Sequence, residues 1–165
     1  MCFNLLFLET YNKDNALAKA FVTGGTGFIG STLVDELIKK NYSVKCLVRK
    51  TSNIKWLKDK PVEFVHGDLW NKEVLLLALK DVDYVYHVGG VTFAKKKEEY
   101  YRGNADATKS LLDICYEANP KIKKFIHLSS QTVTGPSPDE SHPVTEETPC
   151  KPITTYGRSI PVSLI

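Results

Sequence analysis

The sequence predicts an α/β protein built on a doubly wound parallel sheet, and three observations support this fold class. Apolar, strand-like runs alternate with helix-like segments along most of the chain, as in sheets whose strands are joined by crossover helices. A glycine-rich turn links the first of these strands to the first helix. Polar residues follow the ends of later strands. Since ligands bind at the carboxyl ends of such strands, those residues are the first candidates for a site.

The predicted elements alternate in order along the chain. The strands are expected at residues 20–22, 43–48, 62–66, 82–88 and 124–128. The first helix is expected at residues 28–40, where Ile29, Leu33 and Leu37 lie four apart on one face. Two further helices are expected at residues 72–80 and 98–119, and the proline-rich residues 135–152 are expected to form an extended loop.

The composition is ordinary for a soluble globular protein and excludes some classes of function. The 165 residues, 42% of them hydrophobic, suffice for one domain with a buried core. A net charge of +3, from 22 basic and 19 acidic residues, is too small to indicate nucleic-acid binding. The four cysteines have no metal-binding spacing, so no metal site is predicted, and Cys46 and Cys115 are expected to be buried thiols. A reduced, cytoplasmic setting is expected.

The first 19 residues are expected to form an N-terminal extension ahead of a domain at residues 20–165. Residues 1–8 are apolar, but they lack a basic lead-in and are followed by Glu9. This run is too short to span a bilayer and makes a poor signal peptide. It is either an extra packed segment or a simple extension, and no membrane association is predicted.

The glycine-rich turn at residues 23–30 (TGGTGFIG) has the features of a dinucleotide-binding fingerprint. Gly24, Gly27 and Gly30 lie three apart between the predicted strand and helix. Such glycines give a tight turn, room for a pyrophosphate against bare backbone, and close contact between helix and strand. The helix N-terminus adds free N–H groups and a partial positive charge. The alternative is a glycine-rich surface turn, but the flanking strand and helix favour nucleotide binding.

Three later strand ends carry further candidates for cofactor binding. Arg49 and Lys50 follow the second strand, where an acidic residue usually selects NAD, so they favour NADP unless they are only solvated loop cations. Asp68 follows the third strand and either accepts a hydrogen bond from an adenine amino group or caps the next helix. Gly89 and Gly90 end the fourth strand, where they let a cofactor approach the backbone or simply form a turn.

Ser130 and Tyr156 are the candidate catalytic residues. Ser130 ends the fifth strand, and Tyr156 follows the proline-rich loop. A serine hydroxyl can polarise a substrate carbonyl, and a tyrosine hydroxyl is a workable general acid only if its pKa falls toward the working pH. The alternative for Tyr156 is a packing residue near the end of the chain.

With these positions identified, the chain resembles the extended short-chain dehydrogenase/reductase family, also called NAD-dependent epimerase/dehydratases, over about residues 20–159. The resemblance rests on residues 23–30, 67–69 (GDL), 83–90 (DYVYHVGG), 104–108 (NADAT), 128–135 (LSSQTVTG) and 156–159 (YGRS). It implies a Rossmann-like fold with an incomplete sheet and a missing substrate domain.

The resemblance also implies a role for each matching residue. Ser130 would polarise the substrate, Tyr156 would donate or accept a proton, and Asn104 matches the family's helix asparagine, which bears on the architecture of the site. Asp68 would contact the adenine. The cofactor, NADP or NAD, would lie against Gly24, Thr26, Gly27, Phe28, Ile29, Gly30, Arg49, Lys50, Asp68, Leu69, Val88 and Gly89.

The sequence departs from the family pattern directly after Ser159. The family has a lysine four residues after the tyrosine, which lowers the tyrosine pKa and holds the nicotinamide ribose, whereas this chain has Ile160. Pro161 fits only the first turn of a helix, although the family helix continues. We therefore expect a C-terminally truncated or frameshifted member rather than a short natural member that has lost the lysine.

Two functions follow from this pattern. The first is an NAD(P)-dependent oxidoreductase or epimerase acting on a carbonyl or hydroxyl of a small-molecule substrate, with a homodimer as an option for a full-length protein. The alternative is a catalytically inactive NAD(P)-binding module or fragment, which Ile160 and the missing substrate domain favour. A purely structural role on the same scaffold is disfavoured, because it would not explain the polar groups at the carboxyl ends of the predicted strands.

Overall fold

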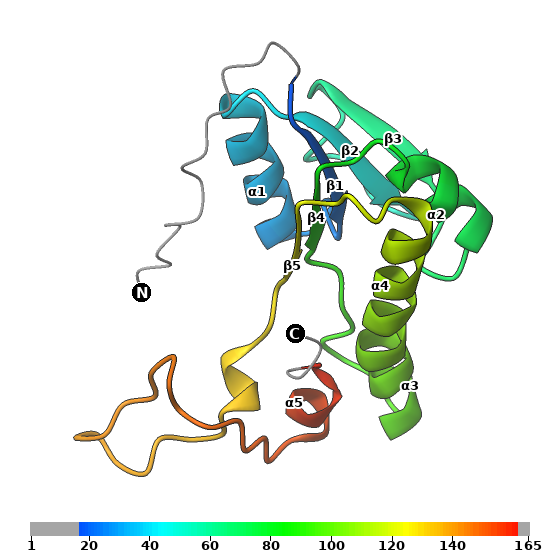
Figure 1. The fold of residues 1–165 in the computed structure, drawn as a ribbon. Helices are drawn as coiled ribbons and strands as arrows, with labels where there is room; N and C mark the ends of the chain where they lie inside the picture. Colours follow the sequence, from blue (N-terminus) through cyan, green and yellow to red (C-terminus); the bar gives the residue numbers. More distant parts are fainter. Residues whose placement is uncertain (1–16, 162–165) are drawn as a thin grey trace.

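A computed structural model describes residues 17–161, which form a five-stranded parallel sheet with helices on both faces (Figure 1). The strands are β1 (Lys19–Thr23), β2 (Ser43–Val48), β3 (Val62–His66), β4 (Tyr84–His87) and β5 (Lys124–His127). Their order across the sheet is β3-β2-β1-β4-β5. The order reverses between β1 and β4, as in a doubly wound Rossmann-like sheet. The predicted fold class is confirmed.

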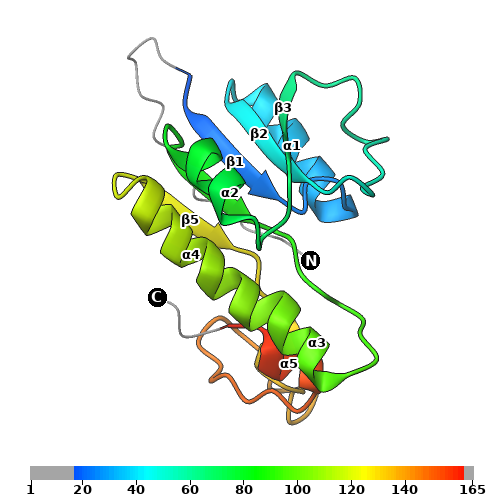
Figure 2. The ribbon, with the colours of Figure 1, turned by 90° about the vertical axis from the view of Figure 1, so that its right-hand side faces the viewer.

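The helices divide between the two faces of the sheet. Helix α1 (Phe28–Lys39) covers one face, and helices α2 (Lys72–Leu79) and α4 (Ala107–Ala118) lie side by side on the other (Figures 1 and 2). Two short helices, α3 (Lys97–Tyr101) and α5 (Thr155–Ser159), lie near the carboxyl-end side of the sheet (Figure 2). This arrangement keeps the carboxyl ends of the strands free of long helices.

The predicted single helix over residues 98–119 is interrupted. Helix α3 is followed by a π-helical segment, Arg102–Asp106, and only then by α4. A π-helical turn accommodates one extra residue and is common at functional sites. Nothing in the apolar periodicity of this segment signals the extra residue, so the sequence predicted one continuous helix.

The core lies in two layers, one on each face of the sheet. Phe21 of β1 packs toward the α2–α4 side with Leu111, while its neighbour Val22 packs toward α1 with Leu37. Successive side chains of a strand point to opposite faces, so β1 contributes to both layers.

The two cysteines predicted to be buried thiols are buried. Cys46 is fully inaccessible and Cys115 is 6% exposed. Burial raises the pKa of each thiol to about 12, so both remain protonated and unreactive at neutral pH.

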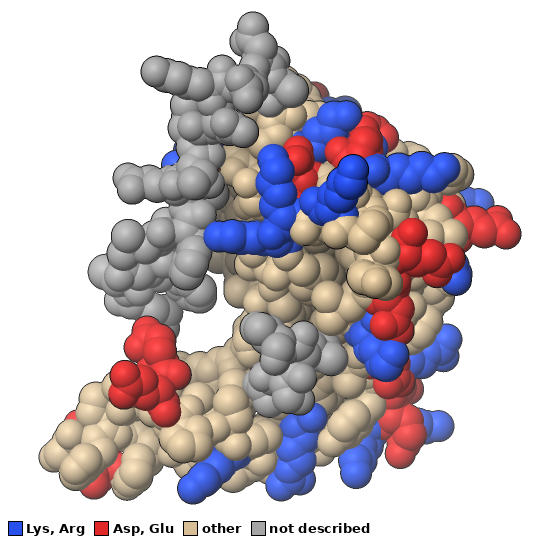
Figure 3. Space-filling view, in the orientation of Figure 1, with Lys and Arg blue, Asp and Glu red and all other residues tan. Residues whose placement is uncertain are grey.

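Ion pairs connect neighbouring elements at the amino ends of the strands. Asp81 accepts from Lys19 at 2.6 Å and from Lys45 at 2.8 Å, and Asp83 pairs with Lys123 at 2.9 Å. Hydrogen bonds from Lys19 and Lys45 lower the pKa of Asp81 to about 2. Basic and acidic side chains are intermixed over the upper part of the face shown in Figure 3.

Several expectations concern segments outside the sheet. The loop at residues 135–152 contains no helix or strand, as predicted. No helix in residues 17–161 is long and apolar enough to span a membrane. The predicted extension at residues 1–19 lies outside the described residues except for its last three.

Candidate functional site at the carboxyl ends of the strands

The strand ends that carry the predicted site residues meet at one edge of the sheet. Thr23 at the end of β1 is in register with Leu47 of β2 and with His87 of β4. Val48 is in register with His66 of β3. The residues that follow β1 to β4 are therefore neighbours in space, although they are spread along the sequence.

Two glycines of the turn at residues 23–30 are required by the packing of the backbone itself. Gly24 has a φ of +72°, and a Cβ there would lie 2.5 Å from the amide nitrogen of Gly89. A Cβ at Gly30 would lie 2.1 Å from the carbonyl oxygen of Gly24. Any other residue at Gly24 or Gly30 would collide with backbone, so these glycines close the turn tightly against β4 and α1.

Gly27 differs from these two glycines because the protein itself leaves room for a side chain. A Cβ there would meet only the carbonyl oxygen of Gly24, at the ordinary distance of 3.4 Å, and Gly27 is exposed. What glycine provides at this position is open space on the outer side of the turn. This is the opening through which a ligand can reach the backbone.

The N-terminus of α1 is open toward the same space. Its N-cap is Gly27, which has no side chain to accept from the first amides, and its first turn contains no acidic residue. Within residues 17–161, no group accepts from the amides of Phe28 and Ile29, and both side chains are exposed. Thr26 precedes them and is half-buried. Free amides at a helix N-terminus favour a negatively charged ligand.

The candidates after β2 are free basic side chains. Arg49 and Lys50 are both exposed, and neither has an acidic partner among the described residues. The backbone of Arg49 is held by a hydrogen bond from its amide to the hydroxyl of Ser52 at 3.1 Å. The loop is therefore fixed while the two cationic side chains remain available to an anion.

The acidic candidate after β3 does not cap the next helix. Asp68 accepts a hydrogen bond from the amide of Trp70 at 2.8 Å, which leaves its other oxygen free, and it is exposed. The N-cap of α2 is Asn71, whose side chain accepts from the amide of Val74. Leu69, between them, packs against the core on the α2–α4 side. The capping role weighed for Asp68 therefore belongs to Asn71.

A chain of buried hydrogen bonds lies behind the glycine turn. The amide of Gly89 donates to the hydroxyl of Thr23 at 3.2 Å, and that hydroxyl lies 2.7 Å from Nδ1 of His87. On the other side of the ring, Nε2 lies 3.0 Å from the hydroxyl of Thr108 in α4, which donates to the carbonyl of Asn104 at 2.7 Å. Thr23, His87 and Thr108 are at most 2% exposed.

His87 is held neutral in this position. Burial, together with the nearby ring of His127, lowers the pKa of His87 to about 4. The two rings are stacked with their centroids 5.3 Å apart. The roles of His87 and Thr108 could not be predicted from the sequence, because a single histidine in an apolar strand gives no signal of its partners.

The π-helical segment places Asn104 between the β4 loop and α5. The amide group of Asn104 accepts from the nitrogen of Val91 at 2.7 Å and donates to its carbonyl at 3.1 Å. It also donates to the hydroxyl of Ser159 at 2.8 Å. Asn104 is 3% exposed, so its role in the architecture of the site is to join these two segments.

Ser159 links Asn104 to the backbone of Tyr156. Its hydroxyl donates to the backbone carbonyl of Tyr156 at 2.7 Å. Thr154 is the N-cap of helix α5, and its hydroxyl accepts from the amide of Gly157. The ring centroid of Tyr156 lies 6.1 Å from that of Tyr100. The tyrosine is thus held through its backbone and its ring.

The other catalytic candidate, Ser130, lies on a segment that packs against α5. A Cβ at Gly157 would lie 2.6 Å from the carbonyl oxygen of Thr132, so the two segments are in close contact. The hydroxyl of Ser130 accepts from the amide and the hydroxyl of Thr132. Because it is an acceptor in both bonds, its own proton is left free to donate. No hydrogen bond joins Ser130 to Tyr156 in the described part of the chain.

Helix α5 ends where the sequence departs from the family pattern. Ile160 has an extended backbone, with φ −79° and ψ 121°, and is 7% exposed. Steric conflict with the ring of Pro161 disfavours helical geometry at the preceding residue. The position four residues after Tyr156 is therefore a buried apolar side chain at the end of a five-residue helix.

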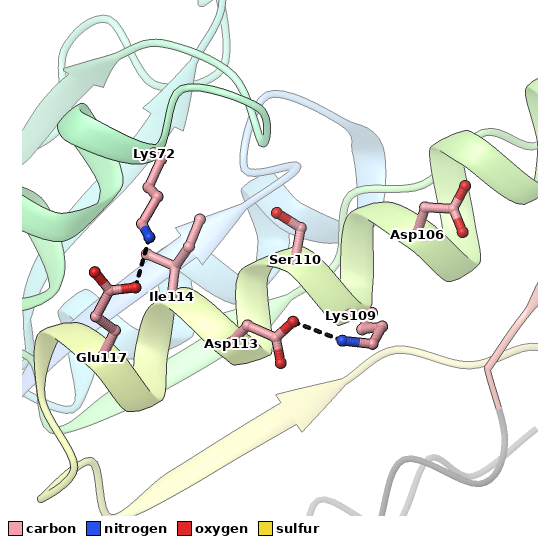
Figure 4. Close-up of a pocket in the computed structure, with 7 residues that line it drawn as sticks. All are labelled: Lys72, Asp106, Lys109, Ser110, Asp113, Ile114 and Glu117. Atoms are coloured by element: carbon pink, nitrogen blue, oxygen red, sulfur yellow. Dashed lines mark hydrogen bonds and ion pairs between the residues drawn. The ribbon is translucent and has the colours of Figure 1, made fainter.

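A separate shallow groove lies on the face formed by α2 and α4 (Figure 4). Four of its charged side chains form ion pairs, Lys72 with Glu117 and Lys109 with Asp113. None of the predicted site residues lines this groove. No group of three potential metal ligands is present in residues 17–161.

Comparison with known proteins identifies the family. The model of the NAD dependent epimerase/dehydratase family matches residues 20–159. The chain belongs to this family. It is 31% identical over 144 residues to a decarboxylating sterol-4-alpha-carboxylate 3-dehydrogenase of Dictyostelium discoideum, covering 86% of this chain and 44% of the relative. It is 33% identical over 147 residues to a UDP-glucose 4-epimerase of Lactobacillus helveticus, covering 86% and 43%.

Solved structures of epimerases share the fold of this family member. A UDP-glucose 4-epimerase from Bifidobacterium longum, in complex with NAD+ and UDP, superposes with a TM-score of 0.73 at 31% identity, covering 86% of this chain and 45% of that one. Another UDP-glucose 4-epimerase gives a TM-score of 0.74 at 27% identity, covering 86% and 44%. The chain thus spans less than half the length of these relatives.

Proposed function

We propose that this chain binds an NAD(P) dinucleotide at the carboxyl ends of β1 to β4. In this proposal it is the cofactor-binding part of an oxidoreductase or epimerase that acts on a carbonyl or hydroxyl of a small molecule. The observation that carries the proposal is the open space at Gly27 in front of the uncapped amides of α1. This combination suits a pyrophosphate, because phosphate oxygens need amide donors and close approach to the backbone.

The other predicted residues supplement this cradle. Asp68 has a free carboxylate oxygen for the adenine amino group, and Val88 and Gly89 would border the dinucleotide along β4. When bound, the dinucleotide would supply a nicotinamide ring that exchanges a hydride with the substrate. Ser130 would donate its free proton to the substrate oxygen, and Tyr156 would exchange a proton there.

We further propose a preference for NADP over NAD. Arg49 and Lys50 are unpaired cations on a loop held by Ser52. A guanidinium binds a phosphate through two charge-assisted hydrogen bonds, whereas a ribose 2′-hydroxyl is better held by an acidic residue. The relatives solved with NAD show that the wider family also uses the unphosphorylated cofactor.

The second candidate function is a binding module without catalysis. Ile160 lies at the end of α5, where the family pattern has a lysine, and it places an apolar side chain at that position. The chain therefore has no ammonium group at the position where the family pattern places one beside the tyrosine. This observation favours cofactor binding without turnover for the chain as given.

A titration with NADPH and NADH tests cofactor binding and its specificity. Nicotinamide fluorescence is measured with the 165-residue chain and with the variants Gly27→Ala and Arg49→Ala. Gly27→Ala should lower the melting temperature only slightly but weaken the binding of both cofactors, because its Cβ fits the protein and fills the opening. Arg49→Ala should weaken NADPH about tenfold and leave NADH unchanged, as expected for one lost charge-assisted contact. Lys58→Ala, another exposed cation, is the control for Arg49.

A turnover assay separates the two candidate functions. The chain is incubated with NADPH and simple ketones, and NADPH consumption is followed. Binding without consumption would favour the inactive module, whereas consumption that Tyr156→Phe abolishes would favour the enzyme. Absence of NADPH and NADH binding by a folded chain would overturn the proposed function. The small-molecule substrate, a homodimer of a full-length protein and a reduced, cytoplasmic setting remain predictions of the same proposal.

A further inference from the structure

The buried histidine behind the glycine turn has a role that the proposed chemistry does not use. We propose that Thr23, His87 and Thr108 form a positioning relay, in which a neutral imidazole holds the Gly89 amide against Gly24. The proposal rests on the proposed dinucleotide binding, since it assigns to His87 the shape of that site. His87 is a positioning residue here, because it is only 1% exposed and both of its ring nitrogens bond to buried threonine hydroxyls.

The hydrogen-bond geometry determines where each proton of the relay lies. The hydroxyl of Thr108 donates its only proton to the carbonyl of Asn104, so it must accept from Nε2 of His87. Nε2 therefore carries the imidazole proton, and Nδ1 is an acceptor. The hydroxyl of Thr23 then donates to Nδ1 and accepts from the amide of Gly89. Every donor in the relay has an acceptor, and the direction of each of its hydrogen bonds is fixed.

The position of the Gly89 amide matters because the glycine turn is packed directly on it. A Cβ at Gly24 would lie 2.5 Å from that nitrogen, and one at Gly89 would lie 3.2 Å from the hydroxyl of Thr23. A displacement of Gly89 would therefore move the turn that offers the α1 amides. The relay opposes this displacement through Thr108, a residue of α4 that lies outside the glycine turn.

The surroundings of His87 support the neutral ring. The groups that face it are the stacked ring of His127, the ring of Phe125 at 6.1 Å and the two threonine hydroxyls. None of these groups is an acid. A second proton on Nδ1 would face the hydroxyl of Thr23 and force that hydroxyl to turn its proton away from the ring.

The test removes the Thr108 hydroxyl at one end of the relay and measures the effect on the Gly89 amide at the other end. Thr108→Val replaces the hydroxyl by a methyl group of similar volume, and Thr108→Ser keeps the hydroxyl. Thr32→Val is the matched control, because Thr32 also donates to the carbonyl four residues earlier in its helix, at 3.1 Å to Phe28, but is exposed. Three readouts are used: the NADPH dissociation constant, hydrogen exchange at the Gly89 amide, and the imidazole nitrogen shifts of His87.

The relay predicts a specific pattern in these readouts. Thr108→Val should raise the NADPH dissociation constant about tenfold and speed exchange at Gly89, whereas Thr108→Ser and Thr32→Val should remain close to wild type. The nitrogen shifts of the wild-type chain at neutral pH should show a neutral ring protonated on Nε2. A ring protonated on Nδ1, or equal binding and exchange in Thr108→Val and wild type, would overturn the relay.

Failure of the relay and failure of the proposed function remain distinguishable. A wild-type chain that does not bind NADPH contradicts the proposed function, while the nitrogen shifts and the exchange at Gly89 still decide on the relay. If Thr108→Val does not fold, Thr108→Ser and the nitrogen shifts of the wild-type chain decide instead. In that case Thr108→Ser with Gly89 exchange as slow as in wild type supports the relay, and fast exchange overturns it.

Discussion

The two ends of the parallel sheet are held together by opposite kinds of chemistry. At the amino ends, three lysines and two aspartates form partly exposed ion pairs, such as that between Lys19 and Asp81. At the carboxyl ends, neutral groups form buried hydrogen bonds, and glycines bring backbone against backbone. The proposed cofactor site lies at the carboxyl ends only.

This difference shows which end of the sheet tolerates change. An exposed ion pair contributes from nothing to about 1 kcal/mol, because water and salt compete for both partners. A buried hydrogen-bond chain costs more to break, since a donor left without an acceptor retains its full desolvation penalty. The free energy of unfolding should therefore respond strongly to small substitutions at the carboxyl ends and only weakly to substitutions at the amino ends.

The largest effect is expected from Gly30→Ala at the carboxyl end. Its Cβ would lie 2.1 Å from the carbonyl oxygen of Gly24, a backbone atom that cannot move without opening the turn. We expect a loss of about 3 kcal/mol in the free energy of unfolding, measured by urea denaturation. Gly27→Ala, with its nearest atom at 3.4 Å, is the control and should cost less than about 1 kcal/mol. Equal losses in the two variants would contradict the packing argument.

A loss of stability of similar size is expected in mild acid at the same end. The pKa of His87 is about 4 in the folded chain, against an ordinary value of 6.5. As pH falls from 6.5 to 4, the unfolded chain gains a proton on this residue that the folded chain does not, so the free energy of unfolding decreases. The full difference amounts to about 3 kcal/mol, and it is absent above pH 6.5.

Denaturation at a series of pH values measures this effect. Burial lowers the pKa of His127 as well, so its contribution has the same sign. Replacing the exposed His66 by Gln should leave the decrease unchanged, whereas His87→Gln should make the curve flatter between pH 6.5 and 4. A curve that stays steep in His87→Gln would assign the acid sensitivity to another group.

The smallest effect is expected at the amino ends. Asp81→Asn removes the acceptor charge shared by Lys19 and Lys45, and the aspartate side chain is 47% exposed. We expect less than about 1 kcal/mol at low salt and a smaller value at high salt, measured by the same denaturation assay. A loss as large as that of Gly30→Ala would show that the amino ends are the more demanding part of the sheet.

The sequence predicted well whatever depends on local pattern. The five strands, the first two helices and the glycine turn follow from apolar periodicity and glycine spacing, and the structure confirms them. Burial of Cys46 and Cys115 was also predictable, because both lie in apolar runs. The roles of Ser130, Tyr156 and the cofactor-binding residues stay predictions.

The sequence could not show what depends on partners far apart along the chain. Thr23 and His87 are 64 residues apart, and Asn104 and Ser159 are 55 apart. No local pattern indicates that these side chains meet, and the π-helical turn that brings Asn104 into place has no apolar signature. The helix cap is a different case, because Asp68 and Asn71 are close together in the sequence. Both residue types are suitable N-caps, and only the three-dimensional structure shows that Asn71 caps α2.

The π-helical turn at Arg102–Asp106 also has a consequence for insertions and deletions. Each residue of an α-helix turns the chain by about 100°. Because the wide turn takes up one extra residue, deleting a residue before Asn104 or after it would restore a regular helix with little rotation of the flanking segments, and the side chains within the turn would change the direction they face by up to that angle. Asn104 would then face away from Val91 and Ser159, although no contact residue had been replaced. In this segment the number of residues constrains the chain as strictly as their identity.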